Sequence, residues 1–316
     1  MSFFVLVSVA SGPSGPSRSA PDSREFWLES WDGSQVLPIG GYHHEGALQL
    51  QTGNAGLEEA PTDVFVDRLA QASGGVVVDA QSPPRPILLP LQVNTRDQAE
   101  QLREVQALRD LTDPTVDMTR DGNFRLVCRS ASGTRQLGLV RRSGMEGTGG
   151  LLPWSARYVL DCVAPQPFAE DRDVQTRPFQ LEQPDTPFLG GVWGQIGLVS
   201  SRIAGPDTPV VMTSAVPVYP TITVTGPASS VLITGDNGLR LDVPDGLTAG
   251  EVLVWVTDPR HRSVRVNGAL AAGRLARGSR PAPFGLGTTT LSVSAPDATG
   301  DTRLVISWRG LHRSLW

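Results

Sequence analysis

The chain has 316 residues, which is too long for one ordinary β-rich domain and sufficient for two domains with separate cores. Its 39% hydrophobic and 19% charged residues exclude a disordered or fibrous protein. The formal net charge is −5 and all 27 basic residues are arginine, without a basic cluster, which disfavours nucleic-acid binding.

The first feature in chain order is an apolar run at residues 3–10, followed by a Gly/Pro/Ser tract at residues 11–19. The run is far below the ~18 residues that span a bilayer, and it lacks the basic start of a signal peptide. A signal peptide, an arm that pairs with a partner and a disordered end all remain open. We treat residues 1–20 as an extension or arm, whose candidate interface residues are Phe3, Phe4, Val5, Leu6 and Val7.

Strand signals recur along the whole chain. The two-residue alternation of half-buried strands occurs at residues 125–129, 221–225, 239–243, 264–266 and 303–308. Between such segments lie five dipeptides that favour positive φ: Asp32-Gly33, Asp121-Gly122, Asn237-Gly238, Asp245-Gly246 and Asn267-Gly268. This combination predicts a mainly β protein of sandwich or barrel architecture.

One segment has helical spacing instead. Thr95 is a candidate helix cap with Gln98 as its reciprocal partner, and Pro114 stops the pattern. Apolar residues then recur at three- and four-residue intervals: Ala99, Leu102, Val105, Leu108 and Leu111. We predict a single helix at about residues 96–111.

A boundary is expected near Asp173, because residues 169–187 are charged, contain proline and show no periodicity. It divides the chain into a first β domain at residues 21–172, which carries the helix, and a second β-sandwich domain at residues 173–316. Residues 271–287 are rich in turn-forming residues and predict a long loop in the second domain.

No motif for chemistry is present. A nucleophile elbow, a phosphate-binding glycine loop and a zinc-protease motif are all missing from the sequence. His43 and His44 are adjacent, and on an extended chain they point to opposite faces, so they do not readily share a metal ion. We therefore predict a protein that is not an enzyme, with no catalytic residue, no metal site and no cofactor.

Cysteine and tryptophan give weaker signals. Cys128 and Cys162 lie on the apolar side of strands, where they are either small buried hydrophobic residues or a bridge between neighbouring strands. Tryptophans inside alternating strands are expected in the core. Trp193, between glycines, and Trp316, at the end of the sequence, are candidate interface residues instead.

The order of segments resembles the distal tail proteins of siphophages, also known as Dit-like minor tail proteins. In the first half, the segments that carry the resemblance are residues 26–33, 86–93, 157–162 and the pair Pro167-Phe168. In the second half they are residues 219–226, 239–243, 250–254, 262–268, 284–287 and 303–309. The resemblance covers about residues 24–310 and rests on order and spacing.

The resemblance implies a structural role in a virion. A protein of this family forms a ring, most often a hexamer, at the distal end of the tail, through its first domain. The ring joins the tail tube to the tip or baseplate hub and lets DNA pass without specific binding. The implied partners are copies of itself, the tail tube protein, the tape measure protein and the tail-tip or baseplate hub proteins, with no membrane. The second domain is implied to be a galectin-like β-sandwich.

An alternative function is a carbohydrate-binding module protein that attaches to cell-envelope glycan. This alternative predicts two or three coplanar exposed aromatic residues above a groove in the second domain. The ring hypothesis instead predicts contact surfaces on the first domain.

Overall fold

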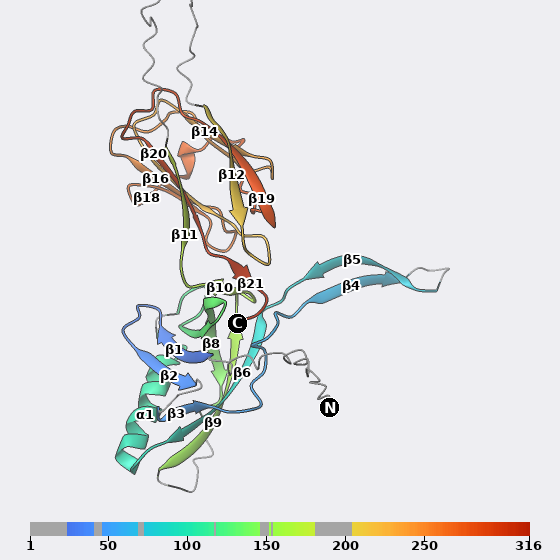
Figure 1. Ribbon diagram of the computed structural model, residues 1–316, viewed down its shortest axis with the longest axis vertical. Helices are drawn as coiled ribbons and strands as arrows, with labels where there is room; N and C mark the ends of the chain where they lie inside the picture. Colours follow the sequence, from blue (N-terminus) through green and yellow to red (C-terminus); the bar gives the residue numbers. More distant parts are fainter. Residues whose placement is uncertain are drawn as a thin grey trace, which may run out of the picture.

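The protein folds around two separate hydrophobic cores, as a computed structural model shows (Figure 1). The structure describes residues 24–40, 46–68, 73–116, 118–145, 152, 154–180 and 204–316. Strands dominate and one α-helix is present among these residues, so the predicted mainly β class is confirmed.

The first core is formed by residues of a nine-stranded sheet and of the helix. The sheet runs in the order β2-β1-β7-β8-β9-β6-β3, with β10 paired to β8 and to β21. Its strands are β1 (Glu25–Ser30), β2 (Val36–Gly40), β3 (Leu48–Leu50), β6 (Arg85–Asn94), β7 (Phe124–Ser130), β8 (Gly133–Ser143), β9 (Ser155–Ala164), β10 (Ala169–Asp171) and β21 (Leu311–His312). Because β8 pairs with β7 through Leu139 and with β9 from Val140 onward, apolar residues from both halves of the sheet meet in one core.

The helix α1 (Gln98–Leu111) confirms the predicted helix, but its cap differs. Asp97, not Thr95, accepts the hydrogen bond from the backbone N–H of Glu100, and the Glu100 carboxylate accepts from the backbone N–H of Arg96. The first turns stand away from the core, because Leu102 is 62% exposed whereas Val105, Leu108 and Leu111 are buried.

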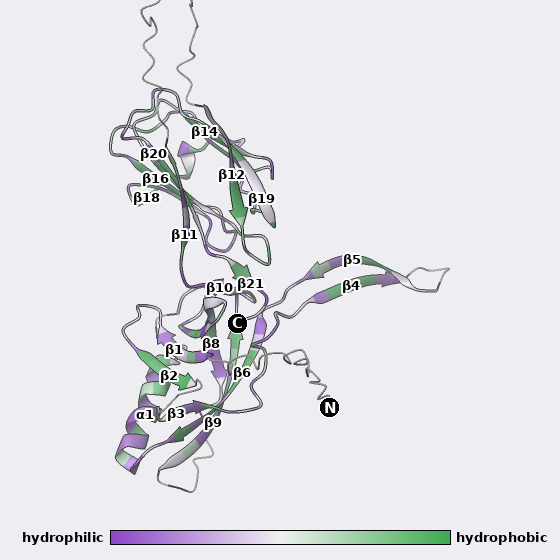
Figure 2. Ribbon diagram, viewed as in Figure 1, coloured by the Kyte–Doolittle hydropathy of each residue, from purple (hydrophilic) through white to green (hydrophobic). Residues whose placement is uncertain are grey.

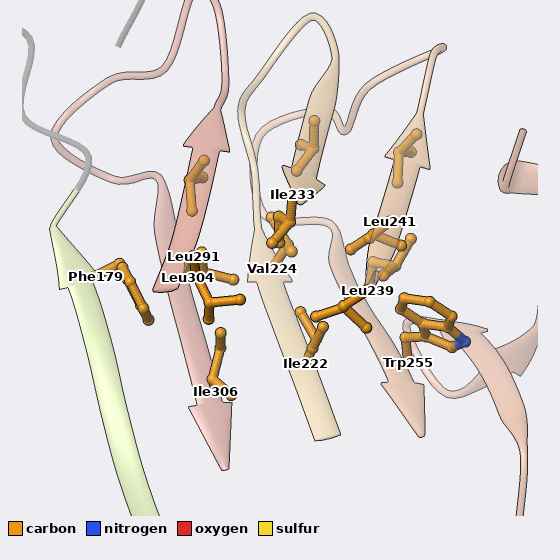
Figure 3. Close-up of a cluster of buried hydrophobic side chains, with 14 of the residues drawn as sticks. Phe179, Ile222, Val224, Ile233, Leu239, Leu241, Trp255, Leu291, Leu304 and Ile306 are labelled. Atoms are coloured by element: carbon orange, nitrogen blue, oxygen red, sulfur yellow. The ribbon is translucent and has the colours of Figure 1, made fainter. Parts of the chain in front are cut away.

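The second core is a β-sandwich of a six-stranded sheet, β11-β20-β13-β16-β17-β18, and a four-stranded sheet, β12-β19-β14-β15. Its strands are β11 (Gln175–Gln180), β12 (Ala204–Met212), β13 (Thr221–Thr225), β14 (Val231–Gly235), β15 (Arg240–Val243), β16 (Val252–Val256), β17 (Ser263–Val266), β18 (Ala269–Leu270), β19 (Gly287–Ser294) and β20 (Arg303–Trp308), with a short 3-10 helix at Ala272–Arg274. Alternate residues of the two sheets point toward each other, and Trp255 is fully buried among them (Figure 3).

The predicted turns are confirmed. The glycine of each of the five dipeptides has a positive φ, between 60° and 128°. Between β17 and β18 both residues are left-handed, with φ 49° at Asn267 and 83° at Gly268, as a two-residue hairpin of the primed type requires. Three of the five dipeptides, Asp32-Gly33, Asn237-Gly238 and Asn267-Gly268, connect paired strands, so the local chemistry of these turns sets those hairpins.

The predicted aperiodic segment is structured where it is described. Within residues 169–180 the chain forms β10, which joins the first sheet, and β11, which pairs with β20 of the second. The absence of local periodicity gave no sign of these two strands, because strand pairing with distant segments overrides the weak local pattern. Residues 181–187 lie outside the described residues.

Both cysteines are buried and neither forms a disulfide bond, which confirms them as small core residues rather than a bridge. Cys128 and Cys162 are fully buried in the first core. Burial raises the pKa of the Cys162 thiol to about 12, because a thiolate is poorly solvated there.

Candidate functional site

A two-stranded hairpin projects from the first core, clear of both cores (Figure 1). It consists of β4 (Asp63–Arg68) and β5 (Gly75–Gln81), which pair with each other and with no further strand of the described chain. Every residue of both strands is exposed. A two-stranded ribbon of this kind is marginally stable alone in water, so contact with a partner would stabilise it.

Hydrophobic residues occupy much of the hairpin (Figure 2), and six of them have exposed side chains. They are Val64, Phe65, Val66, Val76, Val77 and Val78, each between 51% and 62% exposed. The register pairs Val64 with Ala80 and Val66 with Val77, so these four apolar residues share one face, which Arg68 continues toward the turn. The opposite face is mixed, because Phe65 pairs with Asp79 and Val76 with Asp67.

The hairpin can make two kinds of contact. Its outer backbone edges carry no strand partner in the described chain, so they can accept a strand from another molecule. Its apolar face offers hydrophobic burial in the same place. Exposed contiguous apolar surface of this sort is typical of a protein–protein interface.

The base of the hairpin is fixed by the end of the chain. Residues 57–62, which lead into β4, include the buried Leu57 and Ala60. The backbone N–H of Leu315 donates to the carbonyl of Leu57 at 3.1 Å, and the N–H of Ala60 donates to the carbonyl of Arg313 at 3.0 Å. The hairpin therefore leaves the body of the protein from a rigidly paired segment.

Arg85, the first residue of β6, is a buried cation beneath this base, with 0% of its surface exposed. Its guanidinium donates to the carbonyls of Gly56, Pro167 and Arg313, the last two at 3.1 and 2.9 Å. Burial lowers the pKa of Arg85 to about 10, and Glu59 raises it in part. At neutral pH the group stays charged and is held by backbone dipoles from three separate segments.

A second buried charged residue, Glu29, links the first sheet to Arg172, which lies in the segment between β10 and β11. Glu29 of β1 is 3% exposed, and Arg172 donates to its two carboxylate oxygens at 2.6 and 2.8 Å. The hydrogen bonds from Arg172 hold the pKa of Glu29 below its ordinary range, although burial alone acts in the opposite direction. Arg309, directly after β20, donates to the carbonyl of Arg172, so the end of β20 is joined to the same cluster.

This cluster predicts a pH-dependent contribution to stability. Because the folded-state pKa of Glu29 is lowered, the stabilisation is present above the unfolded pKa and is lost as the pH falls from about 5 toward 3. We expect Glu29→Gln to lower the free energy of unfolding by about 2 kcal/mol at pH 7. The difference from the parent in urea titrations should shrink toward zero at pH 3, and a constant difference would contradict this assignment.

The predicted interface residues fall in different places. Phe3, Phe4, Val5, Leu6, Val7 and Trp193 lie outside the described residues, as do His43 and His44. Trp316 is half-buried and packs within its own chain, 6.0 Å from Phe26 in an edge-to-face arrangement, with the Arg24 guanidinium 4.4 Å above its ring. The hairpin was missed, although the apolar runs at residues 64–66 and 76–78 were a visible strand signal.

The second core offers little to the glycan alternative. In the described range 204–316, the exposed large hydrophobic residues are Val211, Leu270 and Leu286, none of them aromatic. Within the part of the chain that the structure describes, no cluster of three or more His, Cys, Asp or Glu residues is placed to bind a metal ion, and no helix is long and apolar enough to cross a membrane.

Comparison with known proteins reveals a likeness in structure alone. No family model and no curated protein matches the sequence. The crystal structure of the SPP1 Dit (gp 19.1) protein, described as a paradigm of the hub adsorption apparatus in phages that infect Gram-positive bacteria, is similar with a TM-score of 0.60 and 17% identity over 90% of this chain and 98% of that chain. Chains of the phage P2 baseplate in its activated conformation, with Ca and with Sr, are similar with a TM-score of 0.51 and 8% identity over 90% of this chain and 97% of theirs. The resemblance seen in the sequence is thus confirmed in the fold: along nearly its whole length, the chain has the fold of the SPP1 Dit protein.

Proposed function

We propose that the chain is a structural protein of a phage tail, located at the distal end of the virion's tail. The observation that carries this proposal is the projecting hairpin, whose exposed apolar face requires a partner. The likeness to a phage hub protein over nearly the whole chain supports the same function.

The hairpin favours assembly of identical copies into a ring. It leaves one side of the first core, so copies that place it on a neighbour make a contact between two different surfaces (Figure 1). A contact between unlike surfaces, repeated around an axis, closes into a ring when the rotation from one copy to the next is a whole fraction of 360°. We infer a hexamer, with residues 21–172 as the ring domain, residues 173–316 as the outward sandwich, and the boundary near Asp173.

The proposed partners follow from this position. The ring joins the tail tube to the tip or baseplate hub proteins, meets the tape measure protein, and leaves a passage for DNA. The net charge of −5 suits a passage that does not hold the phosphate backbone. The role is mechanical and requires no enzyme activity.

The test is the oligomeric state of the purified full chain. Native mass spectrometry and class averages from negative-stain electron microscopy are expected to give closed rings with six-fold symmetry. A chain that remains monomeric at every concentration reached, with no ring in the images, would overturn the proposal.

A further inference from the structure

We propose that the last residues of the chain, 311–316, form a strap that couples the orientation of the second core to the base of the hairpin. The coupling lies within one chain, so it does not depend on ring formation. It goes beyond the proposed function because it assigns a mechanical link between the surface that meets a neighbour and the outward sandwich.

The strap begins in the second core. It follows β20, which ends at the buried Trp308, and Leu311 packs against the second core. Ser214 fixes this point, because its hydroxyl accepts from the N–H of Leu311 at 2.8 Å and donates to the carbonyl of Leu311 at 2.9 Å. The N–H of Ala215 donates to the same carbonyl at 2.8 Å.

The strap ends in the first core. Leu315 has 0% of its surface exposed and belongs to the first core, only four residues after Leu311. Between them, β21 pairs with β10, with His312 opposite Ala169. Four residues in extended backbone span at most about 14 Å, so the two anchor points cannot separate without one leaving its core.

Between its anchors the strap pairs with the base of the hairpin. It accepts from Ala60 at the carbonyl of Arg313 and donates to Leu57 from the N–H of Leu315. Arg85 donates to the same Arg313 carbonyl from beneath. A movement of the second core that pulls on residues 311–313 is therefore passed directly to the segment from which β4 starts.

The end of the strap is locked in place. Trp316 contacts Phe26 and Arg24, and its backbone N–H donates to the Ser314 hydroxyl at 3.1 Å. The guanidinium of Arg135 donates to the carbonyl of Ser314 at 3.2 Å. These contacts keep Leu315 in the first core, so the strap is a fixed connection rather than a loose tail.

The experiment measures the distance between hairpin and second core. Spin labels are placed by Glu58→Cys, at the base of the hairpin, and by Leu286→Cys, in the second core; both positions are exposed, while the native cysteines are buried and do not react. Labelled chain is mixed with excess unlabelled chain, so that only distances within one molecule are read by pulsed electron paramagnetic resonance. The parent is expected to give one narrow distance peak.

Leu315→Ser and a chain that lacks residues 313–316 are expected to lose that narrow peak and to give a broad distribution. The matched control, Leu270→Ser, changes a leucine that is 76% exposed and should keep the peak. Circular dichroism shows whether Leu315→Ser folds. If it does not, Trp316→Ala is the milder variant, and it should also broaden the distance peak. A narrow, unshifted peak in the folded strap variants would overturn the coupling, whatever the oligomeric state of the chain.

Discussion

A chain with both Val66→Asp and Val77→Asp is expected to fold normally and to fail to assemble. The two valines pair across β4 and β5 on the apolar face and are 54% and 62% exposed, so neither contributes to a core of its own chain. In an assembled ring, the introduced carboxylates would be buried against apolar surface without partners, at a cost of several kcal/mol per interface. Because about 1.4 kcal/mol changes an equilibrium tenfold, we expect association to weaken by roughly a thousandfold or more.

Sedimentation velocity on the parent and on the double variant measures this effect at equal concentration. The matched control carries Val211→Asp and Leu286→Asp, which place the same charges at residues 62% and 63% exposed on the second core. The control should assemble as the parent does. Unchanged assembly of the hairpin variant would show that the hairpin is not the joint, even if rings form by other surfaces.

Much of the fold was predictable because its determinants are local. The alternation at residues 221–225 and 303–308 coincides with β13 and β20, since each strand has one face in the core and one in water. Asn267-Gly268 sets its hairpin because both residues readily adopt the left-handed conformation that the turn requires. The helix followed from the spacing of Val105, Leu108 and Leu111, which are the residues that it buries.

The candidate site was less predictable because its determinants are distant. The apolar run at residues 76–78 is typical of a strand buried on both faces. Its local sequence does not distinguish such a strand from an exposed one like β5. The strap is too short for any periodicity, and its role depends on Leu57 and Arg85, more than two hundred residues away. The helix cap differed because Asp97 offers a carboxylate closer to the first turn, while the Thr95 hydroxyl bonds to backbone carbonyls.

Replacement of Arg85 is expected to have the largest effect on stability. Arg85→Met removes the charge and leaves the carbonyls of Gly56 and Pro167 without their buried donor, while the carbonyl of Arg313 keeps the N–H of Ala60. Each buried acceptor that loses its partner costs about 1–3 kcal/mol, partly offset because a buried cation no longer has to be desolvated. We expect the free energy of unfolding to fall by about 3–5 kcal/mol, measured by denaturant titration at pH 7.

Two further variants separate the roles of charge and geometry at Arg85. Arg157→Met changes an exposed arginine of β9 and should alter the free energy of unfolding by less than about 0.5 kcal/mol. Arg85→Lys keeps a cation but replaces the planar fork with a single ammonium, which cannot direct donors to three carbonyls on separate segments. If Arg85→Lys is as stable as the parent, charge alone holds the site. A loss close to that of Arg85→Met instead shows that the fork itself joins the Gly56 loop, the Pro167 turn and the strap.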